Sequence, residues 1–338
     1  MTKSKTDGYF LERNEGFSEV TDADDFLHPE QNASIKDPTL TETQFLGFSV
    51  PEANIHAYCY LWHHPNLHIV SGGLLVFQGI KDVQVEAELS DVRVYMNEDA
   101  LAKDLHEFRL DNGYGVKVID PMRRLHMTYS DPQRDNSVDV EITAVMPAFK
   151  FADGDHFDQP MRVKGSLVLR GKRYPVDCYH VRDRSWGRPR QEYLQPIPPL
   201  SWATAVFNDD FALHCSILDQ AAHNPELKGT RFDLPVEKTL LSGWVQRDGK
   251  RGLVVSGSKR VVRDKRTFMP EIIEYSFTDN LGRNFDLKGT VVASCPYAIW
   301  PNLYFPCRLA RWECDGMVAH GDLQEAIWND YANFMRGR

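Results

Sequence analysis

The stretch that decides the fold runs Val138-Asp139-Val140-Glu141-Ile142-Thr143-Ala144. A period of two places its apolar residues on one face of a β-strand and its polar residues on the other. The same alternation, or a short apolar run between turn residues, predicts further strands at 67–77, 83–89, 114–119, 161–170, 174–181, 202–207, 211–218, 252–262, 272–278, 285–293 and 303–314.

Turn residues separate many of these strands, at Asp111-Asn112-Gly113, Arg170-Gly171-Lys172, Asp248-Gly249-Lys250 and Asp315-Gly316. Asp-Gly and related pairs adopt positive φ easily, which suits the tight turns of antiparallel hairpins. A single helix of any length is expected at 322–335, where apolar residues recur at roughly helical spacing. The pattern therefore predicts an all-β sandwich or barrel rather than a Rossmann-type sheet.

The length of 338 residues favours two domains, because a single core rarely grows beyond about 250–300 residues. The first 40 residues are rich in polar residues and proline and lack a periodic apolar pattern. The most loop-like break near the middle is 153–160. We therefore expect an irregular N-terminal lead-in at 1–40, a first barrel at 41–155 and a second barrel at 156–338.

Composition and charge exclude several classes of function. A net charge of −9 provides no general attraction for phosphate backbones, so nucleic acid is not an expected partner. No run approaches the roughly 20 apolar residues of a membrane span, and no apolar stretch follows the basic first residues as in a secretory signal. A cytoplasmic location is therefore expected. The six cysteines form no Cys-x-x-Cys pair and are expected to be reduced thiols.

Sequence motifs for common cofactors are missing as well. The chain holds no Gly-x-x-x-x-Gly-Lys-Ser/Thr, no strand-anchored Gly-x-Gly-x-x-Gly, no Gly-x-Ser-x-Gly and no His-Glu-x-x-His. We therefore expect no bound nucleotide, flavin or metal, and chemistry that uses no cofactor.

The most unusual string is Tyr174-Pro175-Val176-Asp177-Cys178-Tyr179-His180-Val181-Arg182-Asp183-Arg184-Ser185-Trp186-Gly187. In an unbroken strand Asp183 and Ser185 face one way, and Arg182 and Arg184 face the other. Neighbouring arginines favour the charged form of Asp183, which suits a base. The candidate catalytic residues are Asp183, Arg184, Arg182, Tyr179 and His180. The alternative is an Arg–Asp network that closes one end of a barrel.

A second string, Tyr58-Cys59-Tyr60-Leu61-Trp62-His63-His64-Pro65-Asn66-Leu67-His68, follows closely on His56. Pro65 interrupts the strand geometry and no nearby carboxylate completes a set of metal ligands, so we expect a pocket rim or structural histidines. Aromatic residues later in the chain suit a core or a pocket for a flat apolar ligand. The candidate substrate-binding residues are Trp186, Trp62, His64, His68, Tyr60, Trp300 and Tyr304.

Three strings carry a family resemblance. The strand at 165–171 leads into Arg182-Asp183-Arg184-Ser185-Trp186-Gly187, and a late pattern combines Trp312, Asp315, Gly316, Gly321 and Glu325. In these strings the chain resembles the broad AttH-like and carotenoid 1,2-hydratase-like group. The segment 65–73 looks like the first-domain pattern of a largely uncharacterised bacterial branch. The late pattern also fits a hairpin that seals the second barrel.

The resemblance implies two lipocalin-like antiparallel β-barrels in tandem, here with a short C-terminal helix. In the carotenoid branch it also implies cofactor-free addition of water to an isoprenoid double bond. Relatives often carry histidine in place of Arg184. We therefore assign the acid–base role to Asp183, Tyr179 or His180.

The leading hypothesis is a cofactor-independent lyase, hydratase or isomerase that acts on a hydrophobic phenolic or isoprenoid molecule by acid–base chemistry. One version is an aromatic-catabolism lyase that releases water or a small carbonyl fragment. Arg182 and Arg184 would stabilise negative charge, and Trp186 would pack on the substrate. The alternative is a non-catalytic lipocalin-like carrier of apolar ligands. The substrate and the oligomeric state, a homodimer included, stay open.

Overall fold

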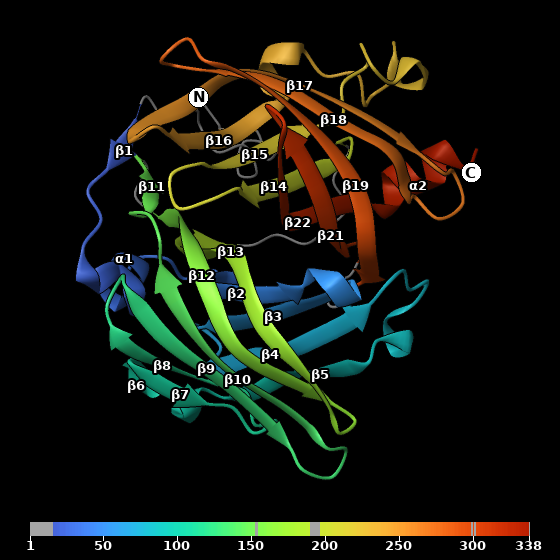
Figure 1. The fold of residues 1–338 in the computed structure, drawn as a ribbon. Helices are drawn as coiled ribbons and strands as arrows, with labels where there is room; N and C mark the ends of the chain where they lie inside the picture. Colours follow the sequence, from blue (N-terminus) through green and yellow to red (C-terminus); the bar gives the residue numbers. More distant parts are fainter. Residues whose placement is uncertain (1–15, 153–154, 190–196, 299, 301, 338) are drawn as a thin grey trace.

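The computed structural model describes residues 16–152, 155–189, 197–298, 300 and 302–337. The chain forms two large β-sheets that stack on each other (Figure 1). The strands that precede the second sheet are β1 (Phe17–Ser18), β2 (Leu40–Val50), β3 (Ile55–His64), β4 (Ile69–Gln78), β5 (Leu89–Asn97), β6 (Ala102–Leu105), β7 (Glu107–Arg109), β8 (Gly115–Asp120), β9 (Arg124–Asp131), β10 (Asn136–Ala144), β11 (Phe149–Phe151), β12 (His156–Leu169) and β13 (Lys172–Pro189).

The second sheet contains β14 (Leu200–Val206), β15 (Ala212–Leu218), β16 (Leu240–Arg247), β17 (Lys250–Arg263), β18 (Pro270–Asp279), β19 (Asn284–Pro296), β20 (Leu303–Tyr304), β21 (Pro306–Cys314) and β22 (Met317–Trp328). Two short α-helices are α1 (Pro29–Asn32) and α2 (Asn329–Met335). Short 3₁₀ helices cover Asp22–Asp25, Pro51–Ala53, Gln84–Glu86, Glu98–Leu101, Pro225–Leu227 and Val236–Lys238.

The first sheet is an open half-barrel with the strand order β5-β4-β3-β2-β13-β12-β10-β9-β8-β7, and β1 and β11 extend it beside β12. The long β13 lies at its centre, where Asp183 pairs with Asp158 of β12 on one side and with Phe45 of β2 on the other. In the described part of the chain, the edge strands β5 and β7 do not pair with each other. This sheet therefore curls without closing.

The second sheet closes on itself. Its order is β14-β15-β16-β17-β18-β19-β21-β22, and a β14–β22 pairing joins the ends, while β20 pairs with β22. Closure removes the unpaired strand edges that an open sheet would expose. The expected all-β fold, two lipocalin-like barrels with a short C-terminal helix, is thus confirmed, with one barrel closed and the other open.

Predicted hairpin turns are found between β12 and β13, between β16 and β17, and between β21 and β22. In each turn a non-glycine residue and the following glycine both have positive φ, between 50° and 79°. The pairs are Arg170-Gly171, Asp248-Gly249 and Asp315-Gly316. Two successive positive φ angles match the twist of antiparallel strands, which explains why glycine follows Arg or Asp here.

One expected strand is wrong in part, and the C-terminal helix is shorter than expected. Residues 83–88 do not form a strand, although β5 begins at Leu89: a 3₁₀ helix forms at Gln84–Glu86, and Val85 is 90% exposed. The carboxylate of Glu86 accepts the backbone N–H groups of residues 82 and 83 and so closes this turn. The helix expected at 322–335 begins only at Asn329, because hydrogen bonds to β14 and β21 hold the preceding residues in β22.

The change from the first sheet to the second falls between Pro189 and Leu200, because β12 and β13 pair within the first sheet. A division near residue 155 would therefore cut through that sheet. We propose that the two domains, if separated, divide after β13.

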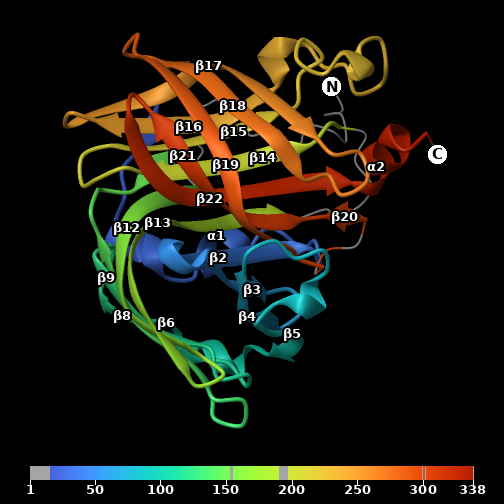
Figure 2. The ribbon, with the colours of Figure 1, turned by 45° about the vertical axis from the view of Figure 1, so that its right-hand side comes forward.

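The two sheets face each other across the middle of the molecule (Figure 2). Aromatic and aliphatic side chains from both sheets pack together between them. Phe149 of the first sheet stacks on Trp244 of the second with ring centroids 4.0 Å apart. Backbone hydrogen bonds also join the two halves of the chain. The N–H group of Lys81 donates to the Ser294 carbonyl at 2.7 Å, and the N–H group of Ser294 donates to the Gly79 carbonyl at 3.0 Å. The sheets thus form one packed unit that can hold a site between them.

All six cysteines are buried free thiols. Within the described ranges, no helix combines the length and the apolar character needed to cross a membrane. The same ranges hold no group of three or more His, Cys, Asp or Glu side chains arranged to bind a metal ion.

Candidate active site

The two faces of β13 differ as the alternation predicts. Asp183 and Ser185 are partly exposed and line a cavity between the sheets. Arg182 and Arg184 are completely buried on the other side of the strand. The strand thus separates a carboxylate and a hydroxyl from the two cations.

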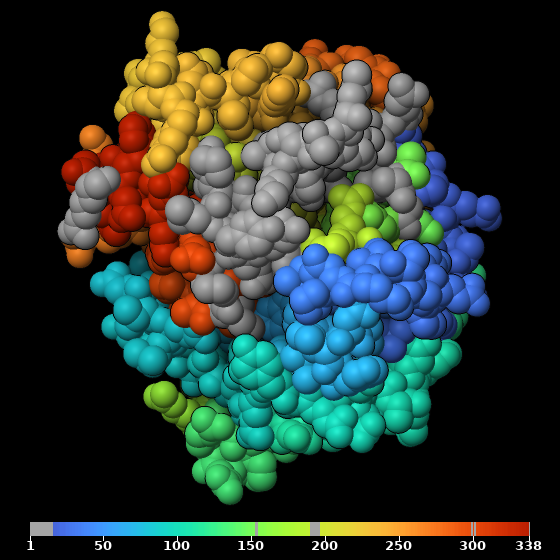
Figure 3. All heavy atoms as spheres, turned by 180° about the vertical axis from the view of Figure 1, so that it is seen from behind, coloured from blue at the N-terminus to red at the C-terminus, as the bar shows by residue number. Residues whose placement is uncertain are grey.

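The two arginines hold the N-terminal segment against the first sheet. Arg182 Nη1 donates to Asp25 Oδ1 at 2.6 Å, and its Nε donates to Gln159 Oε1 at 2.9 Å. Arg184 Nη1 donates to the backbone carbonyl of Asp25 at 2.5 Å, and its Nη2 donates to Glu42 Oε2 of β2 at 3.1 Å. On the surface, blue atoms of the N-terminal part of the chain adjoin yellow-green atoms from the middle of the chain (Figure 3). This arrangement is the Arg–Asp network that the sequence left as an alternative to catalysis.

A cavity of about 230 Å³ lies between the two sheets. Strands β3, β12, β13, β14, β20 and β22 all contribute to its wall. The lining residues are Tyr58, Tyr60, His156, Asp183, Ser185, Leu200, Trp202, Trp300, Leu303, Phe305, Gln324, Ala326 and Trp328. Aromatic rings with a few convergent polar groups are typical of sites for small, flat ligands. Three predicted residues, Asp183, Tyr60 and Trp300, meet here.

His156, the first residue of β12, adds an acid to the cavity. It pairs with Ser185 in the strand register, and its Nδ1 lies 3.1 Å from Ser185 Oγ. Its Nε2 lies 3.1 Å from Asp158 Oδ1. Burial lowers the pKa of His156, but the nearby carboxylates of Asp158 and Asp183 outweigh burial and raise it to about 9. His156 therefore carries a proton at neutral pH.

Asp158 contacts the nitrogen of His156 that faces away from Ser185. Its side chain is completely buried, and Oδ2 accepts a hydrogen bond from Trp244 Nε1 at 2.8 Å. Burial raises the pKa of Asp158, but the interactions with His214 and His156 outweigh it and leave the pKa below its usual value. The charged carboxylate fixes the imidazolium ring with its other nitrogen toward Ser185.

The aromatic wall is continuous. The ring of Trp62 lies 4.2 Å from that of Tyr60 and 5.7 Å from that of Trp300, and Trp300 lies 4.7 Å from Phe305. Trp62 therefore supports two cavity-lining rings from behind. Burial, together with surrounding groups that include Asp183, raises the pKa of Tyr58 well above its usual value. Tyr58 thus remains a neutral phenol.

His180 belongs to a different buried cluster. Asp322 of β22 lies between His180 Nδ1 at 3.1 Å and His56 Nε2 at 2.9 Å. Burial raises the pKa of Asp322, but the two histidines outweigh it and hold the pKa far below its usual value. Because His56 and His180 come from the first sheet and Asp322 from the second, the cluster joins the sheets.

Tyr179 and Trp186 lie outside the cavity. Tyr179 donates its phenolic hydrogen to Asp209 Oδ1 at 2.7 Å in a partly exposed position. Trp186 is buried and stacks on His28, with ring centroids 3.7 Å apart and planes within 4°. The structure thus places Trp186 with the N-terminal segment.

The histidines at the end of β3 and Tyr304 are also placed elsewhere. His68 is exposed and pairs with Glu98 at 2.5 Å. His64 lies at the end of β3 and does not line the cavity. Tyr304 donates to the backbone carbonyl of Thr267 at 3.4 Å. Of the seven candidate binding residues, only Tyr60 and Trp300 line the cavity.

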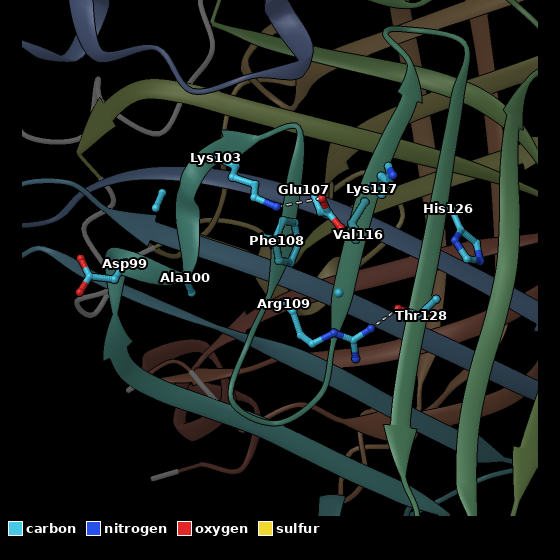
Figure 4. A pocket seen from close by; sticks show the side chains of 12 residues that line it. Asp99, Ala100, Lys103, Glu107, Phe108, Arg109, Val116, Lys117, His126 and Thr128 are labelled. Carbon is cyan, nitrogen blue, oxygen red and sulfur yellow. Dashed lines mark hydrogen bonds and ion pairs between the residues drawn. The ribbon is translucent and has the colours of Figure 1, made fainter.

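A larger hollow of about 490 Å³ lies on the surface of the first sheet (Figure 4). Its charged side chains engage each other or nearby hydroxyls: Lys103 Nζ lies 3.1 Å from Glu107 Oε2, and Arg109 Nη2 donates to Thr128 Oγ1 at 3.3 Å. These groups are exposed and do not converge as an acid and a base. We therefore take the smaller inter-sheet cavity as the candidate site.

Sequence reasoning missed His156 and Gln324, and it placed Trp202 only among the aromatic residues that suit either a core or a pocket. His156 stands in the stretch interpreted as the break between domains. The available signal was the period-two pattern of 161–170, which continues backward through Phe157. Nothing local to Gln324 marks it, because it enters the site through the pairing of β22 with β14.

Fold and site together define a two-sheet, lipocalin-like β protein with Asp183 and His156 in an aromatic cavity between the sheets. The chain belongs to the family described as a domain of unknown function, DUF7064, whose model matches residues 21–330. No curated protein matches the chain.

Solved structures share the fold at low sequence identity. A Nitrosomonas europaea protein assigned as AttH has a TM-score of 0.59 and 14% identity, over 90% of this chain and 97% of that one. The protein CghA has a TM-score of 0.57 and 11% identity, over 95% and 97%. Kievitone hydratase from Nectria haematococca has a TM-score of 0.47 and 11% identity, over 95% and 99%. The likeness to the AttH-assigned structure and to CghA confirms the fold that the resemblance implied.

Proposed function

We propose that this protein is a cofactor-independent hydro-lyase or hydratase, which removes or adds water on a hydrophobic aromatic or isoprenoid molecule. The observation that carries the proposal is that Asp183 and a protonated His156 line the same aromatic-walled cavity. A carboxyl group that can accept a proton and an imidazole that can donate one are the two groups that reversible water elimination needs.

In the elimination direction, the Asp183 carboxylate takes a proton from a substrate carbon. The electron pair of that C–H bond forms the new C=C bond, and the C–O bond to the hydroxyl breaks. His156 donates its proton to the departing oxygen, which leaves as water. Hydration is the same sequence in reverse, and solvent returns the proton between turnovers.

The polar groups next to His156 position it for this reaction. Asp158 orients His156 and keeps it protonated, and Ser185 Oγ marks the position next to the imidazole where a substrate or water oxygen would lie. Arg182 and Arg184 then act on the fold, by holding the N-terminal segment.

The proposal is tested by incubating the purified protein with hydroxylated and unsaturated aromatic and isoprenoid compounds. Mass spectrometry would detect the gain or loss of one water molecule, and compounds that co-purify with the protein would be identified first and included. A protein that binds such compounds but converts none of them would be a carrier, which is the alternative function.

The elimination rate should fall as the pH rises past about 9, because only protonated His156 can donate to the departing oxygen. The expected decline is about tenfold per pH unit above that value. The slower variant His156→Gln should lack this decline, since glutamine does not titrate. A wild-type profile that stays flat up to pH 10 or more would remove His156 from the acid role.

A further inference from the structure

Gln324 of β22 carries a buried donor that has no partner in the described part of the chain. The residue is 9% exposed, it lines the inter-sheet cavity, and its amide nitrogen forms no hydrogen bond with any described residue. A buried N–H group without an acceptor is destabilising, so such groups are rare and call for an explanation. An acceptor brought by a ligand would satisfy this nitrogen.

The position of Gln324 in β22 fits a role in the cavity. Ala326 and Trp328, which follow at the period of two, line the same cavity, and Asp322, which precedes, faces the first sheet. The alternate residue Glu325 lies instead among the buried cations of the second barrel. Gln324 therefore belongs to the face of β22 that meets the first sheet.

The polar groups of the cavity thus come from both sheets. Asp183 and His156 belong to the first sheet, and Gln324 belongs to the second, with aromatic rings between and around them. A ligand that spans this space would present a reacting carbon to Asp183, the hydroxyl to His156, and an acceptor oxygen to the side-chain amide of Gln324.

We propose that Gln324 donates a hydrogen bond to a ligand carbonyl oxygen, and that the ligands are flat aromatic ketones or aldehydes whose carbonyl is conjugated with the hydrated double bond. This inference rests on the proposed function and names its substrate class. A carbonyl is the acceptor that the chemistry favours, because removal of a proton from the adjacent carbon moves negative charge onto that oxygen.

The step balances with the groups present. Asp183 takes the proton from the carbon next to the carbonyl, and charge develops on the oxygen that Gln324 contacts. The charge returns to form the C=C bond as the C–O bond at the next carbon breaks. His156 supplies the proton with which the hydroxyl leaves as water. The product is a conjugated enone, and the reverse reaction hydrates it.

The test measures equilibrium binding by quenching of tryptophan fluorescence. Benzylideneacetone is the carbonyl probe. The first comparison is its methylene analogue, in which a CH₂ group replaces the carbonyl oxygen, and the second is its allylic alcohol. We expect wild type to bind the ketone about tenfold more tightly than the methylene analogue, the typical effect of one buried hydrogen bond.

The variant Gln324→Met keeps the length of the side chain and removes the donor, so the ketone preference should fall to less than about twofold. The matched control is Gln246→Met, because Gln246 is also a buried strand glutamine, 8% exposed, but does not line the cavity. This control should keep the full preference.

The inference is overturned if wild type binds neither probe, binds the methylene analogue as tightly as the ketone, or prefers the alcohol. It is also overturned if Gln324→Met keeps the preference. If Gln324→Met does not fold, the comparison of the ketone with the methylene analogue in wild type still tests the inference. If wild type prefers the ketone but converts none of the compounds in the hydration assay, that result counts against the proposed function and not against Gln324.

Discussion

Asp183→Asn is expected to lower the rate of water addition or loss by about 10²- to 10⁴-fold, the usual contribution of a general acid or base. Asparagine keeps the shape of the side chain and one acceptor oxygen, but it has no charge with which to take a proton. Asp183 is only partly buried and lines the cavity. The melting temperature should therefore change by only a few degrees.

A control variant on the same strand separates this effect from a general loss of charge. Asp177→Asn removes an exposed carboxylate that pairs with Arg162 at 2.6 Å and is remote from the cavity lining. Exposed pairs contribute only about 0–1 kcal/mol, so this variant should keep wild-type stability and rate. If Asp183→Asn instead melts far lower and keeps its rate per folded molecule, Asp183 is structural and the base must be sought elsewhere.

The strand pattern could be predicted from the sequence where local alternation and burial coincide. The run Val138–Ala144 and the Asp-Gly turns are read correctly because a half-buried strand and a tight turn each have a local signature. The run 83–89 has the same alternation, yet Val83 and Val85 remain exposed, because a 3₁₀ helix at Gln84–Glu86 breaks the strand geometry and only Ala87 and Leu89 are buried. Sequence periodicity cannot show which faces are covered.

The site could be predicted only in part, because its members meet through long-range pairing. Asp183 stands in an unusual string and was found. His156 reaches the cavity through the pairing of β12 with β13. Its acid character depends on Asp158, two residues further along the same strand, and on Asp183, which only this pairing brings near. The roles of Arg182 and Arg184 depend on Asp25 and Glu42, whose contact no local pattern reveals.

Glu325, a residue of the late motif, has a structural role, and its substitution is expected to cause a large loss of stability. It is completely buried and pairs with both Arg308 and Arg263, and Ser201 Oγ donates to it at 3.1 Å. Asp219 is the second carboxylate of this cluster, and it pairs with Arg263 and with Lys259. Three cations thus share two buried carboxylates inside the closed barrel.

Glu325→Gln is expected to lower the free energy of unfolding by about 3–5 kcal/mol, because it leaves three buried cations with the single carboxylate of Asp219. This is a large part of the roughly 5–15 kcal/mol that stabilises a typical domain. The matched control is Glu313→Gln, which removes an exposed carboxylate paired with Arg311 and should change stability by less than about 0.5–1 kcal/mol. Urea unfolding followed by tryptophan fluorescence measures both.

The pH dependence of this difference identifies the charge as its cause. Burial raises the pKa of Glu325, but Arg263 and Arg308 outweigh burial and lower it to about 2, from the 4.5 expected in the unfolded chain. A lowered pKa means that the carboxylate stabilises the fold above pH 4.5, and that this contribution is lost as the pH falls toward 2. The gap between wild type and Glu325→Gln should therefore shrink over that window. A gap that stays constant from pH 7 to pH 3 would instead assign the destabilisation to altered packing.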